Sequence, residues 1–413
     1  MVSSGNNGNG GLSSTVIYTF MGLMILTGSI NTIANKLQNN STSLGQPYQH
    51  VWFITFCMFL GETTCMLWYA VWRWRQPKDE EGNLIQEKGE ELKEASPFML
   101  AIPALCDFFG STIMTFGLTM MAGSVYQMFR GSLIFFTALL SIIFLKNKLY
   151  RHNYLALVVV IIGLLLVGLA SKIFPPEPVE GCGESQGTKD SFWGIVLVLV
   201  AQVFSASQFI VEEKFMKGYH CHPLKAVGWE GIWGSIIYLI LLVIFQFVPC
   251  EAPPVGGTNL SSFICSPNDK NEWTLEDTVF AFRQMGDNGA LLFYVILYIC
   301  SIALFNFVGI SVAKYASSPA RAVVDTVRTI VVWGFFLMPF IDKCHRESFN
   351  WLQLVGFVLL VFGTVIYNEV LVLPFLGFDQ YTKKALESKK QQLLETDEQG
   401  ELNTQRNTGI DTK

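Results

Sequence analysis

The chain has 413 residues, of which 51% are hydrophobic and 14% aromatic, and its formal net charge is −5. Charged residues make up 15% of the chain, well below the ~25% typical of soluble domains. This composition excludes an ordinary soluble domain and indicates a polytopic membrane protein. It shows no basic stripe of the kind that binds nucleic acid.

Ten apolar blocks are long enough to cross a membrane as helices, which takes ~20 residues each. The predicted fold class is therefore all-α and polytopic, with ten transmembrane helices. A Gly/Asn-rich segment without Lys or Arg precedes the first block, so we do not expect a cleaved signal peptide. The blocks lie near 15–36, 50–73, 98–119, 122–145, 152–172, 192–214, 224–248, 290–313, 319–340 and 350–372.

The distribution of basic residues predicts the orientation. An even number of spans puts both termini on one side of the membrane. If that side is the cytosol, its connections carry thirteen Lys and Arg residues, against seven in the opposite loops. The positive-inside rule therefore favours cytosolic termini. The sequons at Asn39, Asn40 and Asn259 then fall on the other side, where glycosylation is expected.

Four of the nine cysteines also fall on the non-cytosolic side: Cys182, Cys250, Cys265 and Cys344. Four cysteines allow three pairings. Cys250 and Cys265 form the most local pair, which we favour as a disulfide. The other five are more typical of apolar packing than of redox chemistry.

The longest external loop, 249–289, ends in TLEDTVFAFRQMGDN. Its apolar residues Leu275, Val279 and Phe282 recur at helical spacing. Thr274 could cap such a helix, with Asp277 closing a capping box. We expect a short amphipathic helix on the membrane surface, with an ordinary loop helix as the alternative.

The sequence repeats itself at an offset of about 198 residues, which is typical of duplicated transporter halves. Asp107–Gly110 matches Asn306–Gly309, and Gln127 with Arg130 matches Asp325 with Arg328. Each copy holds five spans, an odd number, so the second copy must be inverted. We therefore expect a disordered cytosolic N-terminus (1–14), a first repeat (15–172), a lumenal linker (173–191), a second repeat (192–372, with the lumenal loop 249–289) and a cytosolic tail (373–413).

Arg130 is a full charge inside an apolar block, which costs roughly 2.5–3.5 kcal/mol on insertion scales. It either lines a solute pathway or pairs with a buried acid. The match with Arg328, which enters from the opposite side, favours the pathway. Asp325 and Arg328 are three residues apart and could pair with each other, leaving Arg130 freer to meet a solute.

Candidate site residues follow from this arrangement. We expect Glu62 and Glu230 to carry a proton, although each could instead be a satisfied interhelical partner. The candidate solute-binding residues are Arg130, Gln127, Tyr126, Asp107, Asn306, Asp325 and Arg328.

Seven motifs together resemble the drug/metabolite transporter superfamily, specifically solute carrier family 35, subgroup F, over about residues 16–377. The motifs are LTGSINT (26–32), MFLGE (58–62), PALCD (103–107), QMFRG (127–131), VEEKF (211–215), HPLKAVG (222–228) and FNFVGIS (305–311). The resemblance implies ten helices in two inverted halves and transport activity. It also implies a lysosomal or other endomembrane location, with a mitochondrial association left open.

The function expected is secondary active transport of a small polar or charged solute by alternating access, with proton coupling open. The alternative is a membrane scaffold or regulatory partner that keeps a transporter fold without transport. We find no catalytic, phosphate-binding or zinc motif, so no enzyme activity, cofactor or metal is expected. The expected partners are a small-molecule solute and the lipid bilayer, with a homodimer left open.

Overall fold

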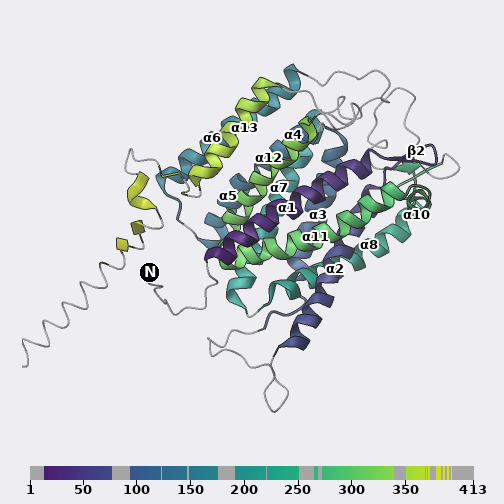
Figure 1. Cartoon of the computed structure of the whole chain (residues 1–413), viewed down its shortest axis with the longest axis horizontal. Coiled ribbons are helices and arrows are strands. Elements are labelled where there is room, and N and C mark those ends of the chain that lie inside the picture. The colour runs from purple at the N-terminus through teal and green to yellow at the C-terminus, as the bar shows by residue number, and fades with distance from the viewer. Residues whose placement is uncertain are drawn as a thin grey trace, which may run out of the picture.

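The computed structural model describes residues 14–76, 94–121, 123–146, 148–174, 191–219, 221–250, 265–267, 272–338, 350–367, 369, 371–372, 378–382, 385–386, 388–389 and 392. Most of these residues lie in long helices that run side by side (Figure 1). The helices are α1 (Ser14–Asn39), α2 (Val51–Arg75), α3 (Ala101–Thr119), α4 (Gly123–Arg130), α5 (Leu133–Leu145), α6 (Arg151–Ile173), α7 (Ser191–Gly218), α8 (Pro223–Phe245), α10 (Thr278–Asp287), α11 (Gly289–Tyr315), α12 (Ser318–Leu337) and α13 (Trp351–Tyr367), followed by a 3₁₀ turn, η1 (Phe378–Tyr381).

Within the described residues, eight helical stretches are long and apolar enough to cross a membrane. They are α1, α2, α3, α4 with α5, α6, α7, α8 and α11. The last two expected spans are also helices, but α12 carries three charged residues and α13 has 17 residues. Large apolar side chains such as Leu165, Val243 and Phe293 are exposed, as lipid-facing residues should be. The chain is therefore an all-α, multi-pass membrane protein.

The expected single helix over 122–145 is interrupted. Helix α4 ends at Arg130 and α5 begins at Leu133. Between them, the Gly131 and Ser132 amides donate to carbonyls three residues back, at 3.0 Å each. Glycine loses the most backbone entropy in a helix and serine is a weak helix former, so a regular turn is less stable at Gly131 and Ser132. Arg130 is therefore the last residue of a helix, where the helix dipole favours a cation.

Helices α6 and α13 pack along each other at one side of the bundle (Figure 1). Glycines allow this close approach. A Cβ atom at Gly163 would lie 2.7 Å from the carbonyl oxygen of Gly356, and the reverse contact would be 2.8 Å. Small residues serve this purpose in membrane helix pairs, where backbone packing replaces the hydrophobic effect.

The N-terminal and C-terminal helices interleave. Helix α1 packs along α11, α3 along α7, and α2 along α8. The largest buried apolar cluster lies among these helices and includes Phe59, Tyr238, Tyr298 and Phe305. Polar groups brought to this interface come from both parts of the chain.

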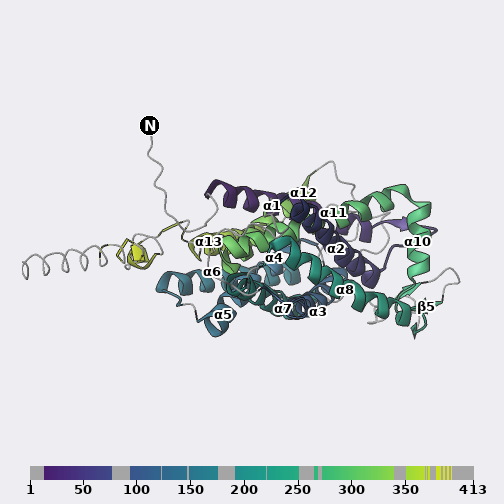
Figure 2. The ribbon, with the colours of Figure 1, turned by 90° about the horizontal axis from the view of Figure 1, so that it is seen from below.

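One end of the bundle carries short strands and α10, and Figure 2 shows α10 lying across the direction of the long helices. The strands are β1 (Thr42–Ser43), β2 (Gln46–Pro47), β3 (Pro249–Cys250), β4 (Ser266–Pro267) and β5 (Trp273–Thr274). β1 and β2 form an antiparallel pair, and β3, β5 and β4 form an antiparallel sheet in that order. We call this end the capped end.

The expected helix in the last external loop exists, but it begins later than the sequence predicts. Its N-cap is Asp277, whose side chain accepts a hydrogen bond from the Phe280 amide at 2.9 Å. Thr274 lies in β5 and does not cap the helix, because its backbone pairs with β3 and β4. The apolar Val279 and Phe282 are exposed on this helix.

A disulfide joins Cys250 and Cys265 at the capped end, the pair that the sequence favours. Cys182 and Cys344 lie outside the described residues, as do the segments 1–13, 175–190 and 393–413. Asn39 and Asn40 lie at the end of α1 next to β1. The Asn39 amide donates to Asn35, Asn40 is exposed, and Asn259 is outside the described part of the chain.

Candidate functional site

Three charged side chains of α12 lie on one helix face. Arg321, Asp325 and Arg328 follow each other at i, i+4 and i+7, the spacing of one face of a helix. All three are buried. Arg321 and Asp325 pair with charged groups of other helices, and Arg328 pairs with Asp325, so α12 contributes to two neighbouring charged clusters.

The first cluster, which we call the arginine cluster, consists of Arg130, Asp325 and Arg328. One carboxylate serves two guanidinium groups here. Asp325 Oδ1 lies 2.8 Å from Arg328 Nη2, which confirms the expected pair, and Asp325 Oδ2 accepts a hydrogen bond from Arg130 Nη2 at 3.4 Å. The Asp325–Arg328 pair thus does not leave Arg130 without a carboxylate partner, and the contact is of the kind expected in the alternative in which Arg130 meets a buried acid. Among the described residues, Arg130 Nε, Arg328 Nε and Arg328 Nη2 have no hydrogen-bond partner. Because two guanidinium groups share one carboxylate, the cluster has an excess of positive charge.

Aromatic rings line this cluster. The Arg328 guanidinium lies 4.6 Å from the Phe305 ring centroid, and the Arg130 guanidinium lies 5.8 Å from that of Tyr126. Such contacts compensate part of the desolvation of a buried cation. Gln127, next to Tyr126 on α4, is buried, and its Oε1 has no donor within the described structure.

The second cluster, which we call the acidic cluster, gathers four buried carboxyl groups from four helices. They are Glu62 of α2, Asp107 of α3, Glu212 of α7 and Glu230 of α8. They interact electrostatically with one another and with Arg321.

Glycine again brings the backbones close. A Cβ atom at Gly231 of α8 would collide with the backbone of Glu62 and Thr63 in α2. This approach places Glu62 and Glu230 in the same region of the bundle.

Each acid has a different set of partners. Arg321 Nη1 pairs with Glu212 Oε2, and both side chains are 1% exposed. The Asn306 amide donates to Glu62 Oε1. The Ser111 hydroxyl donates to Asp107 at 2.5 Å. Within the described residues, three carboxylate oxygens have no donor: Glu62 Oε2, Glu212 Oε1 and Glu230 Oε1.

The balance of charge in the acidic cluster is negative, because four carboxyl groups face a single guanidinium there. A buried, unpaired carboxylate is costly, and binding a proton or a cation removes that cost. The arginine cluster has the opposite excess. The two neighbouring clusters therefore differ in the sign of their excess charge.

Of the predicted solute- and proton-site residues, four meet in the arginine cluster, namely Tyr126, Arg130, Asp325 and Arg328. Four others meet in the acidic cluster: Glu62, Asp107, Glu230 and Asn306. Gln127 is buried next to Tyr126 on α4.

Sequence reasoning singled out neither Arg321 nor Glu212 as a site residue. The available signal was the spacing of Arg321 with Asp325 and Arg328. It marks a charged face that continues for two helical turns.

Comparisons with known proteins relate this chain to transporters. The CRT-like (chloroquine-resistance transporter-like) family matches residues 16–367. Human solute carrier family 35 member F6 is 34% identical over 380 residues, covering 90% of this chain and 94% of that protein. The Toxoplasma gondii chloroquine resistance transporter is 24% identical over 371 residues, covering 85% of this chain and 37% of that protein.

A solved crystal structure is among those that resemble the fold. Its TM-score is 0.50, with 10% identity over 87% of this chain and 98% of that one. At this identity the likeness concerns the fold alone.

Proposed function

Because the chain belongs to the CRT-like family, we propose that it is a secondary active transporter that moves a small polar or charged solute by alternating access. The observation that carries this proposal is the pair of charged clusters at the bundle centre. Buried polar atoms without partners in the described structure point to groups that bind something else. A scaffold that only kept the fold would be expected to pair these atoms.

The helix packing supports two inverted five-helix repeats. Suppose that α1 corresponds to α7, α2 to α8, α3 to α11, the α4–α5 segment to α12, and α6 to α13. Exchanging the two halves then turns each of the following helix–helix contacts into another contact that is also present. The contact of α1 with α11 becomes that of α7 with α3, and α1 with α12 becomes α7 with α5. The α2–α8 and α6–α13 pairs map onto themselves. Such symmetry places a binding site near the midplane, where the halves meet.

We assign solute contact to Arg130 and Gln127, which lie one turn apart on α4. The Arg130–Asp325 hydrogen bond is long, and it joins the two proposed halves. An anionic or polar group on the solute could replace Asp325 at Arg130, leaving Asp325 with Arg328. Tyr126 would add ring surface beside the solute.

We assign proton or cation exchange to Glu62 and Glu230. Each carries a buried oxygen without a donor in the described structure. Asn306 would hold Glu62 in place, and Asp107 belongs to the same electrostatic network.

The proposed orientation puts both termini in the cytosol and the capped end in the lumen of a lysosome or related compartment. Asn39, Asn40 and the Cys250–Cys265 disulfide lie at this one end of the bundle. Glycosylation and disulfides both belong to the side of the membrane that faces away from the cytosol. The proposal does not require a homodimer.

The test uses purified full-length protein. A thermal-shift screen of nucleotide sugars, peptides, amino acids and thiols would select a solute, and flux of that solute would be measured in proteoliposomes. We expect Arg130→Gln to abolish flux while the purified protein keeps its helix content. Arg75→Gln, which changes an exposed arginine at the end of α2, is the matched control. Unchanged flux in Arg130→Gln would contradict the assigned role, and no flux or ligand in the wild type would favour the scaffold.

A further inference from the structure

The first turn of α12 is fastened to the last turns of α7, at the end of the bundle away from the capped end. The Ser318 amide donates to Glu213 Oε2 at 2.7 Å, and the Ser318 hydroxyl donates to the Phe209 carbonyl at 2.6 Å. Both Ser318 and Glu213 are buried. We call these two hydrogen bonds the α7–α12 clasp.

The chemistry of the groups fixes the direction of each hydrogen bond. A backbone amide and a lysine can only donate, so the Glu213 carboxylate accepts from Ser318 and, through Oε1, from Lys217 at 2.5 Å. The Ser318 amide lies in the first turn of α12, where an amide has no partner in its own helix. Glu213 supplies that partner, and its negative charge faces the positive end of the helix dipole.

A buried arginine continues this contact one turn further along α12. The Arg321 guanidinium lies 3.7 Å from the centroid of the Phe209 ring and pairs with Glu212. On α11, a Cβ atom at Gly309 would lie 2.9 Å from Arg321 Nε, so the backbone of α11 is close as well. The start of α12 is therefore enclosed by α7 and α11.

The end of α11 is fastened at the same place. Lys314 Nζ donates to the carbonyl of Cys221 at 2.8 Å, and Cys221 lies in the short connection between α7 and α8. The Cys221 side chain is buried in an apolar cluster that includes Met216 of α7 and Ile310 of α11. The α11–α12 hairpin thus covers the connection between α7 and α8.

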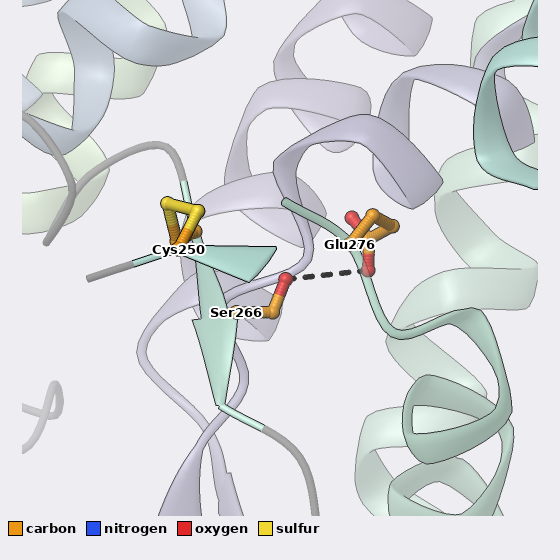
Figure 3. The surroundings of a disulfide bond; sticks show 4 residues. Cys250, Ser266 and Glu276 are labelled. Atoms are coloured by element: carbon orange, nitrogen blue, oxygen red, sulfur yellow. Dashed lines mark hydrogen bonds between the residues drawn. A yellow bond between two sulfur atoms is a disulfide. The ribbon is translucent and has the colours of Figure 1, made fainter. Parts of the chain in front are cut away.

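The two ends of the bundle differ. In the proposed two-fold arrangement, α7 and α11 are equivalent to α1 and α3. Helix α7 packs against α11, whereas α1 and α3 form no comparable contact among the described residues. The capped end has instead the Cys250–Cys265 disulfide and a hydrogen bond from the Ser266 hydroxyl to Glu276 at 3.4 Å (Figure 3). The contacts made by the α11–α12 hairpin are therefore a property of one end.

We propose that the α7–α12 clasp holds the bundle closed at this end and that its two hydrogen bonds break when the solute pathway opens there. The closure rests on the contacts just described, and only its part in transport rests on the proposed function. Alternating access requires each end to open in turn, so the contacts that close an end must be reversible. Two hydrogen bonds meet this requirement, because each has a modest net free energy.

The clasp is linked directly to the acidic cluster. Glu212 and Glu213 are consecutive on α7, and their partners Arg321 and Ser318 lie one turn apart on α12. Moving the first turn of α12 away from α7 therefore separates both pairs. Glu213 and Ser318 are positioning residues in this scheme, because they act on the cluster through the placement of α12.

The test uses Cys221 of the full-length protein in nanodiscs. Because this side chain packs against α11, opening the clasp exposes it to a charged maleimide, and peptide mass spectrometry locates the label. Ser318→Ala removes one hydrogen bond of the clasp and should speed labelling by about two- to tenfold, as expected when a typical hydrogen bond is lost. Glu213→Ala removes the acceptor of the other and should also speed labelling.

Ser207→Ala is the matched control, because it removes a hydroxyl of α7 that donates to the Val203 carbonyl of the same helix. We expect it to label at the wild-type rate. Circular dichroism would establish that all variants keep their helix content. Equal labelling of Ser318→Ala and the wild type would overturn the proposal. Equal acceleration in Ser318→Ala and Ser207→Ala would also overturn it, because a general loosening of α7 would then explain both.

Failure of the clasp and failure of the proposed function give different results, since labelling needs no solute. Faster labelling of Ser318→Ala without solute flux in the wild type would support the clasp and contradict the transport function. Flux in the wild type with unchanged labelling of Ser318→Ala would contradict the clasp alone. With a transported solute present, wild-type Cys221 should label faster than without it, and an unchanged rate would refute opening of the clasp during transport.

Discussion

The Arg328 guanidinium occupies the space that a side chain at Gly28 would need. A Cβ atom on Gly28 would come within 2.7 Å of Arg328 Nη1 and 2.8 Å of the Phe305 ring. Helix α1 therefore passes the arginine cluster at a distance that only glycine permits.

The first prediction follows from this contact. Gly28→Ala should displace Arg328 from Asp325 and lower stability by about 1–3 kcal/mol, the usual cost of overpacking. Gly22→Ala is the matched control, because it lies on the same helix with nothing within 4 Å of its Cβ position. Thermal unfolding in detergent would measure both. Equal melting temperatures for the two variants would show that the contact with Arg328 is unimportant.

The Glu212–Arg321 pair gives a second prediction. Removing one partner of a buried pair leaves an uncompensated charge and typically costs about 3–5 kcal/mol. Arg321→Gln and Glu212→Gln should therefore each destabilise the protein strongly. The double variant leaves neither charge unpaired and should recover much of that loss. A double-mutant cycle of melting temperatures tests this, and purely additive losses would mean that the two side chains do not depend on each other.

A third prediction concerns Glu62 and Glu230. If these acids exchange a proton during transport, Glu62→Gln and Glu230→Gln should each make flux insensitive to a pH gradient. Counterflow exchange of the solute should persist, because exchange does not require net proton movement. Glu94→Gln is the control, since Glu94 is exposed and pairs with Lys225 outside the clusters. A wild-type response to the gradient in both variants would remove these residues from the coupling step.

The disulfide provides a fourth prediction. Cys250 and Cys265 are 15 residues apart, and closing a loop of that length stabilises a protein by about 3 kcal/mol in the chain-entropy estimate. The Cys250→Ser/Cys265→Ser double variant should therefore melt at a lower temperature. Cys300→Ser, at an exposed free cysteine in α11, should melt like the wild type. The same result for both variants would show that the bond adds no stability.

Much of the fold could be predicted from sequence, because a membrane span must satisfy its backbone internally and so appears as a long apolar block. Two features could not. The break after Arg130 depends on local hydrogen bonding at Gly131 and Ser132, which hydrophobicity does not register. The later start of α10 reflects pairing of Thr274 with strands that are distant in sequence.

The candidate site was predictable in composition but not in its pairing. A charge in an apolar block is expensive, so Arg130, Glu62 and Glu230 stood out. Arg321 did not, because it lies only three residues into α12 and could be taken for a loop residue. Which acid meets which arginine depends on the three-dimensional packing of α4, α7 and α12. No sequence spacing encodes this packing.

The interruption between α4 and α5 has no counterpart in α12, which runs unbroken from Ser318 to Leu337. In the proposed two-fold arrangement these are equivalent elements, so one half has a break in the helix where the other has a continuous helix. The proposed solute pathway would then open toward the two compartments by two different helix motions. One gate would bend beside Arg130, and the other would tilt as a whole, carrying Arg321, Asp325 and Arg328 together.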